Sequence, residues 1–371
     1  MIDSLLNSRW PQRLGTLPWG ILLLVLAIGG FGTLVLYSAA GGSLQPWALN
    51  HAVRLLLFTG LAILLSQVPL GAWLRLAYPA YAIVLVGLLL VELLGALGGG
   101  AQRWLDLGIL RLQPSELMKI ALVLALARFY HYLPRGLAGR LAGIWPPVVL
   151  ILLPVALVLL QPDLGTALML VAGGVTIMFL GGLPLRWILL PGAAALASLP
   201  IVYNLLHEYQ QRRVMTFLDP SIDPLGAGYH ITQSKIAIGS GGLFGKGFLN
   251  GSQSHLQYLP EQHTDFVFAT MAEEWGLMGG VALLLAYGVL LNWAMRLARG
   301  TQSVFGRLVA GGLSMTIFFY IAVNAMMVMG MAPVVGLPMP LMSYGGSAMM
   351  TVMIALGILM AIHRDRAERI L

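Results

Sequence analysis

The segment Tyr258–Ala269 (YLPEQHTDFVFA) has the residue types and order best suited to chemistry. A polar stretch runs directly into an apolar one, and Asp265 lies at the junction. At the start of a helix, the macrodipole would keep the Asp265 carboxylate ionised, whereas partial burial would raise its pKa. A carboxylate under both influences is suited to act as a general base. A purely structural role is also open, in which Asp265 or Thr264 only caps the helix that follows.

The histidines near this segment do not form a metal motif. His255 and His263 are close to Asp265 along the chain, but their spacing matches no usual set of metal ligands. The chain has no cysteine, which excludes disulfides and cysteine-based nucleophiles or metal sites.

A second candidate is the segment Gln113–Lys119 (QPSELMK), which leads into another apolar run. Pro114 suits the first turn of a helix. Glu116 and Lys119 are three residues apart, so they share one helix face. Ionisable residues in a membrane helix usually pair with each other inside the protein. The two side chains form either a structural ion pair or part of a cavity lining that holds loop residues in place.

The glycine-rich segment Gly239–Gly247 (GSGGLFGKG) resembles a phosphate-binding loop but does not fit the P-loop pattern. Ser240 replaces the first required glycine, and Gly247 replaces the Ser or Thr that should follow Lys246. The glycines could still bring backbone N–H groups close to an anion, and Lys246 would add a positive charge. A flexible turn explains the segment equally well.

Three further polar segments allow both a functional and a structural interpretation. The adjacent Arg212 and Arg213 could bind phosphate or form a solvated pair at the membrane interface. The segment Gln161–Thr166 (QPDLGT), which contains Asp163, is a tight turn that turn chemistry alone would explain. The uncharged Pro/Gly-rich segment Gly336–Ser347 either lines a cavity or is an ordinary linker.

The elements that must position these residues are transmembrane helices. Of the 371 residues, 58% are hydrophobic and only 9% are charged, whereas a typical globular domain has about 25% charged residues. Such sparse charge cannot coat a soluble surface, so long apolar runs must face lipid. The runs of roughly spanning length are Pro18–Ala39, Val53–Val68, Ala77–Leu97, Pro114–Phe129, Trp145–Leu160, Leu164–Gly181, Trp187–Leu206, Gly276–Arg296, Val304–Met329 and Gly345–Ile362. We therefore expect an all-α polytopic membrane protein of about ten helices, folded as a single domain over residues 1–371.

The basic residues indicate the orientation of these helices and account for the net charge of +7 without nucleic acid. With ten spans both termini lie on one side, and most of the Lys and Arg residues fall there, which by the positive-inside rule makes that side cytoplasmic. They are Arg9, Arg13, Arg75, Arg128, Arg135, Arg140, Arg186, Arg296, Arg299, Arg307, Arg364, Arg366 and Arg369. The other side receives the candidate segments and the longest loop, His207–Thr264, between helices 7 and 8. The chemistry is therefore expected outside the cytoplasm.

Taken together, these segments resemble the SEDS family (shape, elongation, division and sporulation) over nearly the whole chain. The motifs that carry the resemblance are Gly100–Gly108 (GAQRWLDLG), Gln113–Lys119, Gln161–Thr166, Gly228–Gly242 (GYHITQSKIAIGSGG), Leu259–Phe266 (LPEQHTDF) and Ser343–Ser347 (SYGGS). The tripeptide Gly245–Gly247 favours the elongation branch of the family over the division branch.

The resemblance implies a peptidoglycan glycosyltransferase, a hexosyl-transferring enzyme that polymerises lipid II into glycan strands during cell elongation. Transfer would invert the anomeric carbon, and undecaprenyl pyrophosphate would leave. Asp265 matches the essential acid of the family, supported by Glu116, Lys119 and Asp163. The residues expected to bind substrate are Arg54, Arg103, Arg213, Lys246, Gln233, Ser234, Ser343 and Ser347. No organic cofactor is expected, and pyrophosphate departure would proceed with or without a divalent cation such as Mg²⁺ or Mn²⁺.

The resemblance also implies partners and a location. The expected partners are a class B penicillin-binding protein of the PBP2 transpeptidase type and other membrane proteins of the rod complex, in the bacterial inner membrane. Two alternatives stay open. A lipid II flippase would need a polar path that reaches both faces, whereas the charges within the spans cluster at one face. A non-catalytic scaffold for the transpeptidase would leave Asp265 dispensable.

Overall fold

The computed structural model describes residues 15–368, except 95, 99–100, 107–110, 135, 206–207, 224–225, 257 and 260. It is mostly helical, and the ten apolar runs of the sequence fall one by one on its long helices. These are α3 (Trp19–Ala39), α4 (Ala48–Ser66), α5 (Leu70–Leu94), α6 (Pro114–Tyr132), α7 (Leu141–Leu160), α8 (Leu164–Leu180), α9 (Arg186–Leu205), α13 (Val267–Gly300), α14 (Val304–Val328) and α15 (Gly346–Glu368).

Seven helices of the described chain are long and apolar enough to cross a membrane, namely α3, α4, α5, α7, α13, α14 and α15. The apolar α8 has only 17 residues. Helix α6 is 19 residues long, but it carries Glu116, Lys119 and Arg128. The chain therefore has the helices of a multi-pass membrane protein, and the count of ten spans stays a prediction.

The helices form a bundle with a buried centre and a lipid-compatible periphery. Helices α6, α14 and α15 are buried along most of their length, as expected for helices that are apolar on all sides. In contrast, the outer faces of α5, α7 and α9 expose leucine, isoleucine and valine side chains. In water such a surface would aggregate, but in a bilayer it contacts acyl chains.

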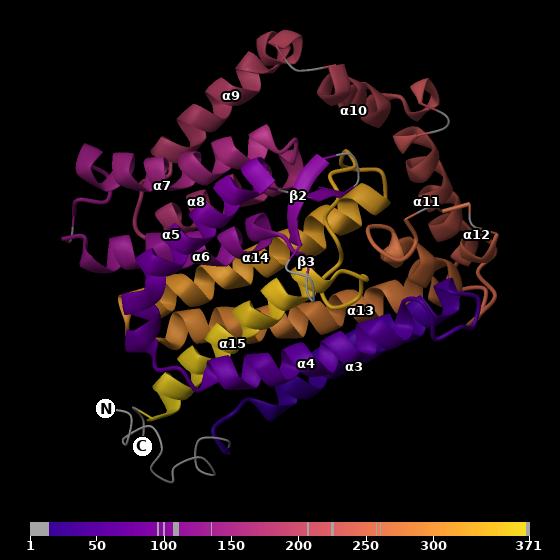
Figure 1. Ribbon diagram of the computed structural model, residues 1–371, viewed down its shortest axis with the longest axis horizontal. Helices are drawn as coiled ribbons and strands as arrows, with labels where there is room; N and C mark the ends of the chain where they lie inside the picture. The colour runs from indigo at the N-terminus through magenta and orange to yellow at the C-terminus, as the bar shows by residue number, and fades with distance from the viewer. Residues whose placement is uncertain are drawn as a thin grey trace.

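The polar segments lie together at one end of the bundle. Figure 1 shows that α3 begins and α15 ends at the opposite end, whereas the strands, α12 and the start of α13 share the polar end. The N-terminal end of α3 and the C-terminal end of α15 thus lie on the same side of the bundle.

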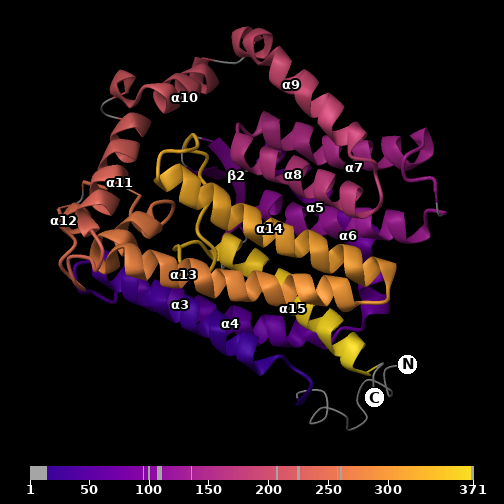
Figure 2. The ribbon, with the colours of Figure 1, turned by 180° about the vertical axis from the view of Figure 1, so that it is seen from behind.

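The segment predicted as one long loop, His207–Thr264, is mostly helical. It contains α10 (Glu208–Leu218), the 3-10 helix η1 (Pro220–Ile222), α11 (Ala227–Gly241) and α12 (Ser252–His255). Together with α9, α10 and α11 form an arch that stands away from the bundle (Figures 1 and 2). Only α11 returns to pack on α13 and α14.

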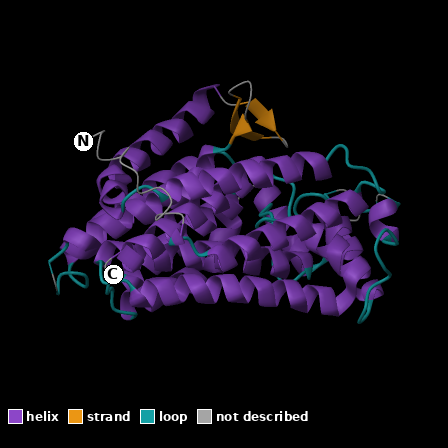
Figure 3. Ribbon diagram, turned by 90° about the horizontal axis from the view of Figure 1, so that it is seen from below, coloured by secondary structure: helices purple, strands orange, loops and turns teal. Residues whose placement is uncertain are grey.

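A small antiparallel sheet covers the polar end of α5. Its strands are β1 (Ala96–Gly98), β2 (Ala101–Asp106) and β3 (Arg111–Leu112), in that order. Figure 3 shows the sheet on one edge of the helical body. Strand β3 leads directly into α6 at Pro114, so the sheet connects the polar end to the helix that bears Glu116 and Lys119.

Candidate active site

Asp265 lies two residues before α13, at the polar end of the bundle, and is half-buried. The backbone around it is held by three consecutive carbonyls, each of which accepts a hydrogen bond from another element. The His263 carbonyl accepts from the Tyr344 N–H (2.8 Å), the Thr264 carbonyl from the Ser343 hydroxyl (2.6 Å), and the Asp265 carbonyl from the Asn324 side-chain amide (2.8 Å). The carboxylate therefore projects from a backbone with little freedom to move.

The surroundings of Asp265 disfavour its charged form. Burial is the main cause, the nearby carboxylates of Glu261 and Asp163 add to it, and the pKa of Asp265 rises to about 7. Thr264 does not cap the helix as the sequence suggested, because its hydroxyl donates to Glu261 Oε2 (2.6 Å) and Phe266 occupies the N-cap position.

The predicted pair of Glu116 and Lys119 is present and buried in α6. Lys119 Nζ lies 2.6 Å from Glu116 Oε1. The hydroxyl of Tyr320, on α14, lies 2.6 Å from Lys119 Nζ and donates to Glu116 Oε2. The result is a closed triad that ties α6 to α14, the helix whose Asn324 holds Asp265. Its geometry supports a positioning role rather than contact with substrate.

Asp163, which the sequence placed in a tight turn, caps α8. Its Oδ1 accepts from the Thr166 N–H (3.1 Å), and its Oδ2 accepts from Gln113 Nε2 (3.4 Å). Arg103, expected to bind substrate, donates instead to the carbonyls of Gln161 (3.1 Å) and Pro162 (2.5 Å). The guanidinium thus fastens strand β2 to the turn that presents Asp163.

Arg54 lies beside the loop that holds Asp265. Its guanidinium stacks on the ring of Tyr344, 4.8 Å from the centroid, and lies next to Gly346 at the first turn of α15. Ser347, in the same turn, donates to the Arg111 carbonyl (3.2 Å) and so joins α15 to strand β3. Among the predicted cations whose side chains are described, Arg54 is the one placed next to the loop around Asp265.

The remaining predicted residues have mostly structural contacts. Lys246 forms an ion pair with Glu273 at 2.6 Å, so its charge is already compensated. Ser234 is buried and donates to the Val328 carbonyl (2.7 Å). Gln233 is half-exposed on α11. Arg213 lies on α10, and its side chain is outside the described part of the structure.

Sequence reasoning missed Asn324 and Tyr320, although a signal was available. Both are polar residues inside the apolar run of α14, and both are fully buried or nearly so. Polar groups within a membrane helix are costly and usually functional. Asn324 donates to the carbonyls of both Asp265 and Leu337 (2.7 Å), so it links Asp265 to the loop before α15.

A metal ion would not find a complete site among these side chains. Within the described ranges, no group of three or more His, Cys, Asp or Glu residues is close enough to hold one. The two acids near Asp265 already accept hydrogen bonds from protein groups. Asp163 caps α8, and Glu261 accepts from the Thr264 hydroxyl.

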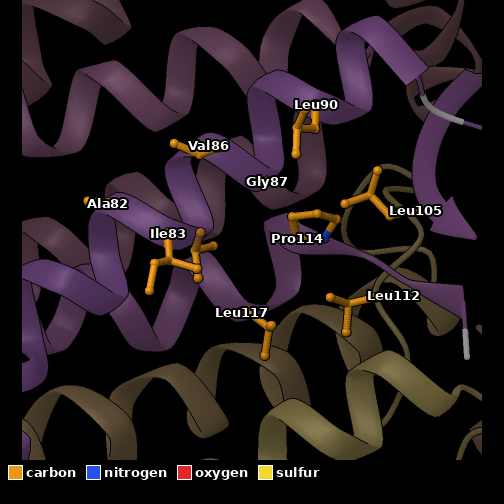
Figure 4. A pocket seen from close by; sticks show the side chains of 10 residues that line it. Ala82, Ile83, Val86, Gly87, Leu90, Leu105, Leu112, Pro114 and Leu117 are labelled. Carbon is orange, nitrogen blue, oxygen red and sulfur yellow. The ribbon is translucent and has the colours of Figure 1, made fainter. Parts of the chain in front are cut away.

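An apolar groove of 490 Å³ lies close to this site, between α5, the sheet and the start of α6. Figure 4 shows the residues that line it. They include Ile83, Val86 and Leu90 from α5, Leu105 and Leu112 from the sheet, and Pro114 and Leu117 from α6. Gln113, between Leu112 and Pro114, is the residue that bonds Asp163. The groove is thus lined by the residues on both sides of Gln113, which contacts Asp163.

Comparison with known proteins gives consistent matches over almost the full length. The family model FtsW/RodA/SpoVE, described as cell cycle protein, matches residues 17–368. The chain is 46% identical to the peptidoglycan glycosyltransferase MrdB of Escherichia coli (strain K12), with 93% of both chains covered. It is 38% identical to MrdB of Helicobacter pylori (strain ATCC 700392 / 26695), covering 95% of this chain and 91% of the other.

Two solved structures share the fold. The Thermus thermophilus rod shape determining protein RodA is 35% identical, with a TM-score of 0.69 and coverage of 94% of this chain and 97% of that one. A chain from the work "Structural coordination of polymerization and crosslinking by a peptidoglycan synthase complex" is 37% identical, with a TM-score of 0.83 and coverage of 94% and 98%.

Proposed function

Because this chain belongs to the FtsW/RodA/SpoVE family, we propose that it is a peptidoglycan glycosyltransferase that polymerises lipid II with Asp265 as its general base. One observation carries the assignment of the base. A half-buried carboxylate with a pKa of about 7 projects from a backbone fixed by three hydrogen bonds. A base is most effective when its pKa is near the working pH.

In the proposed reaction, the Asp265 carboxylate accepts the proton of the GlcNAc 4-hydroxyl of an acceptor lipid II. The oxygen attacks the anomeric carbon of the donor chain from the face opposite the leaving group, so the configuration inverts. The C–O bond to undecaprenyl pyrophosphate breaks, and the pyrophosphate takes the electron pair. The energy for transfer comes with the substrate.

Arg54 is the described cation best placed to stabilise the departing pyrophosphate. Stacking on Tyr344 orients its guanidinium while leaving N–H donors on the edge of the plane. It adjoins the first turn of α15 at Gly346, where backbone N–H groups favour an anion. Arg103 and Lys246 already bond to protein groups, so they hold the site in shape.

The apolar groove beside α5 suits the polyprenyl chain of a lipid II molecule. It is lined almost wholly by apolar side chains and borders the membrane-facing surface of α5. A bound lipid chain would bring its head group to Gln113 and Asp163, next to the base. The basic residues at the opposite end of the bundle support an active site on the extracytoplasmic side of the inner membrane.

We also propose that this chain acts together with a crosslinking partner. A structurally similar chain comes from a complex that coordinates polymerisation with crosslinking. A polymerase alone produces uncrosslinked strands, so a class B penicillin-binding protein of the transpeptidase type is the partner we assign to this chain, within a larger rod complex.

The test uses detergent-solubilised protein, co-purified with the class B partner whose transpeptidase serine is replaced, and labelled lipid II. Asp265→Asn keeps the size and polarity of the side chain but removes the basic oxygen. We expect the rate of glycan formation to fall by about 10²–10⁴-fold, while insertion and partner binding persist. Comparable polymer from both proteins would refute the role of Asp265. A flippase only moves lipid II from one face of a membrane to the other, and detergent removes both faces. If the chain were a flippase, neither wild type nor Asp265→Asn would therefore make polymer.

A further inference from the structure

Helix α13 is broken at Gly276, nine residues after its start. The backbone there has φ 63° and ψ −163°, far from helical values. A break leaves carbonyls unpaired before it and N–H groups unpaired after it. In this protein the segment Gly242–Gly247 supplies partners for two of these carbonyls and two of these N–H groups. The bonds run from Lys246 N to Glu273 O (3.0 Å), Gly247 N to Glu274 O (3.0 Å), Leu277 N to Gly242 O (2.9 Å) and Met278 N to Leu243 O (3.1 Å).

The glycines of this segment are needed for the close approach. Gly245 has φ 80°, and a Cβ atom there would lie 2.0 Å from the Glu274 carbonyl oxygen. A Cβ atom on Gly276 would lie 2.3 Å from the Gly245 nitrogen. The sequence pattern that resembled a phosphate-binding loop is therefore a cap for both sides of a broken helix.

A buried ion pair fixes the same contact through side chains. The Glu273 carboxylate is fully buried and lies 2.6 Å from Lys246 Nζ. Its Oε1 also accepts from the Ser252 hydroxyl (3.0 Å) and the Gln253 N–H (3.0 Å). The neighbouring Glu274 accepts a hydrogen bond from Ser38 on α3. Successive carboxylates thus attach the short half of α13 to two different elements.

We propose that Glu273 is a positioning residue for Asp265, and that the Lys246–Glu273 pair fixes the half-helix Val267–Trp275 that immediately follows the base. This inference rests on the proposed function. Glu273 is eight residues beyond Asp265, about 12 Å along a helix, so it does not touch the reacting atoms. Hydrophobic residues can often replace a buried ion pair without loss of stability. The geometry that the pair imposes is therefore its principal contribution.

The half-helix is short and runs from Asp265 to the break. A shift of its far end therefore acts against the three hydrogen bonds that hold the backbone at Asp265 and reorients the carboxylate, which those bonds do not hold. Glu273→Gln keeps the shape and the acceptor oxygen but removes the charge that holds Lys246. A misplacement of about 1 Å can cost about 10²-fold in rate. We expect the turnover rate to fall by about that factor, with little change in the KM for lipid II.

The experiment measures polymerisation kinetics and pH profiles of the full chain with its class B partner. Wild type, Glu273→Gln, Lys246→Met and Lys246→Arg are compared, and circular dichroism and co-purification of the partner report folding. Lys246→Arg retains the charge and should keep most of the activity. In Glu273→Gln and Lys246→Met, we expect the acid limb of the pH profile to move to lower pH, because a displaced Asp265 is better hydrated. A defect in stability alone would not move that limb.

The matched control is Glu368→Gln, which removes the Arg364–Glu368 pair (3.4 Å) at the opposite end of the bundle and should leave the kinetics unchanged. Glu273→Gln and Lys246→Met with wild-type turnover and pH profile would overturn the role of Glu273 and leave the proposed function intact. The Asp265→Asn variant, measured in the same assay, distinguishes the role of Glu273 from the role of Asp265. Wild-type polymerisation by that variant would overturn the role of Asp265 as the base, and with it the inference about Glu273, while the polymerase activity itself would stand.

Discussion

The raised pKa of Asp265 predicts how polymerisation depends on pH. A base acts only when deprotonated, and the pKa of this carboxyl is about 7. Relative to the alkaline plateau, the rate should therefore be about one half at pH 7, about one tenth at pH 6 and about one hundredth at pH 5. An Asp with its ordinary pKa near 3.9 would lose almost nothing over that interval.

Glu261→Gln tests the physical origin of this shift. Glu261 is exposed, and its negative charge is the second cause of the raised pKa after burial. Removing the charge lowers the pKa of Asp265, so the acid limb should move to lower pH. Because burial remains, the limb should stay above the range of an ordinary Asp. Gln can still accept the hydrogen bond from Thr264, which preserves the local turn.

The assay is the initial rate of glycan formation from labelled lipid II at constant ionic strength, with Glu368→Gln as the charge control. A wild-type rate that is flat down to about pH 5 would contradict a base with a raised pKa. Movement of the limb to higher pH in Glu261→Gln would contradict the electrostatic reasoning.

Two further predictions concern the bundle and its orientation. Glu116→Ala and Lys119→Ala should each abolish activity and destabilise the protein by about 3–5 kcal/mol, because each leaves a buried charge unpaired beside Tyr320. The double variant, measured by thermal unfolding in detergent, should lose less than the sum, and strict additivity would show that the residues do not interact. Since the chain lacks Cys, single cysteines report topology: Asn250→Cys should react with an impermeant thiol reagent added outside spheroplasts, and Arg140→Cys should not. The reverse labelling pattern would overturn the orientation.

The helices were predictable from sequence because long apolar runs have few alternatives in a membrane. Local pairs were also predictable, since Glu116 and Lys119 are neighbours on any helix. Asp265 could be singled out because an acid at the junction of a polar and an apolar segment is unusual. The SEDS resemblance supplied the substrate and the reaction, which the residues alone could not.

Contacts between distant segments were not predictable. Nothing in the sequence indicates that Lys246 meets Glu273, since glycine-rich segments also bind anions and form turns. Arg103 was expected to bind substrate. A guanidinium can donate to two carbonyls as readily as to an anion, and the sequence does not show which of these groups lies within its reach. Thr264 failed as a cap because α13 begins only at Val267, which places Thr264 two residues before the N-cap position that Phe266 occupies.

The triad on α6 has a consequence for how the chain is made. A charged residue opposes insertion of a membrane helix, by about 2.5–3.5 kcal/mol at the helix centre, and Glu116 and Lys119 lie in the first two turns of α6. Glu116 and Lys119 can neutralise each other as soon as α6 is synthesised, because they are one turn apart. Their hydrogen-bond partner Tyr320 is 201 residues beyond Lys119, which takes the ribosome about 10–40 s at about 5–20 residues per second. During that interval Glu116 and Lys119 lack their hydrogen bonds to Tyr320. The triad is complete only when α14 has been synthesised and packs against α6. We therefore expect a chain truncated before α14 to be a substrate for membrane quality control.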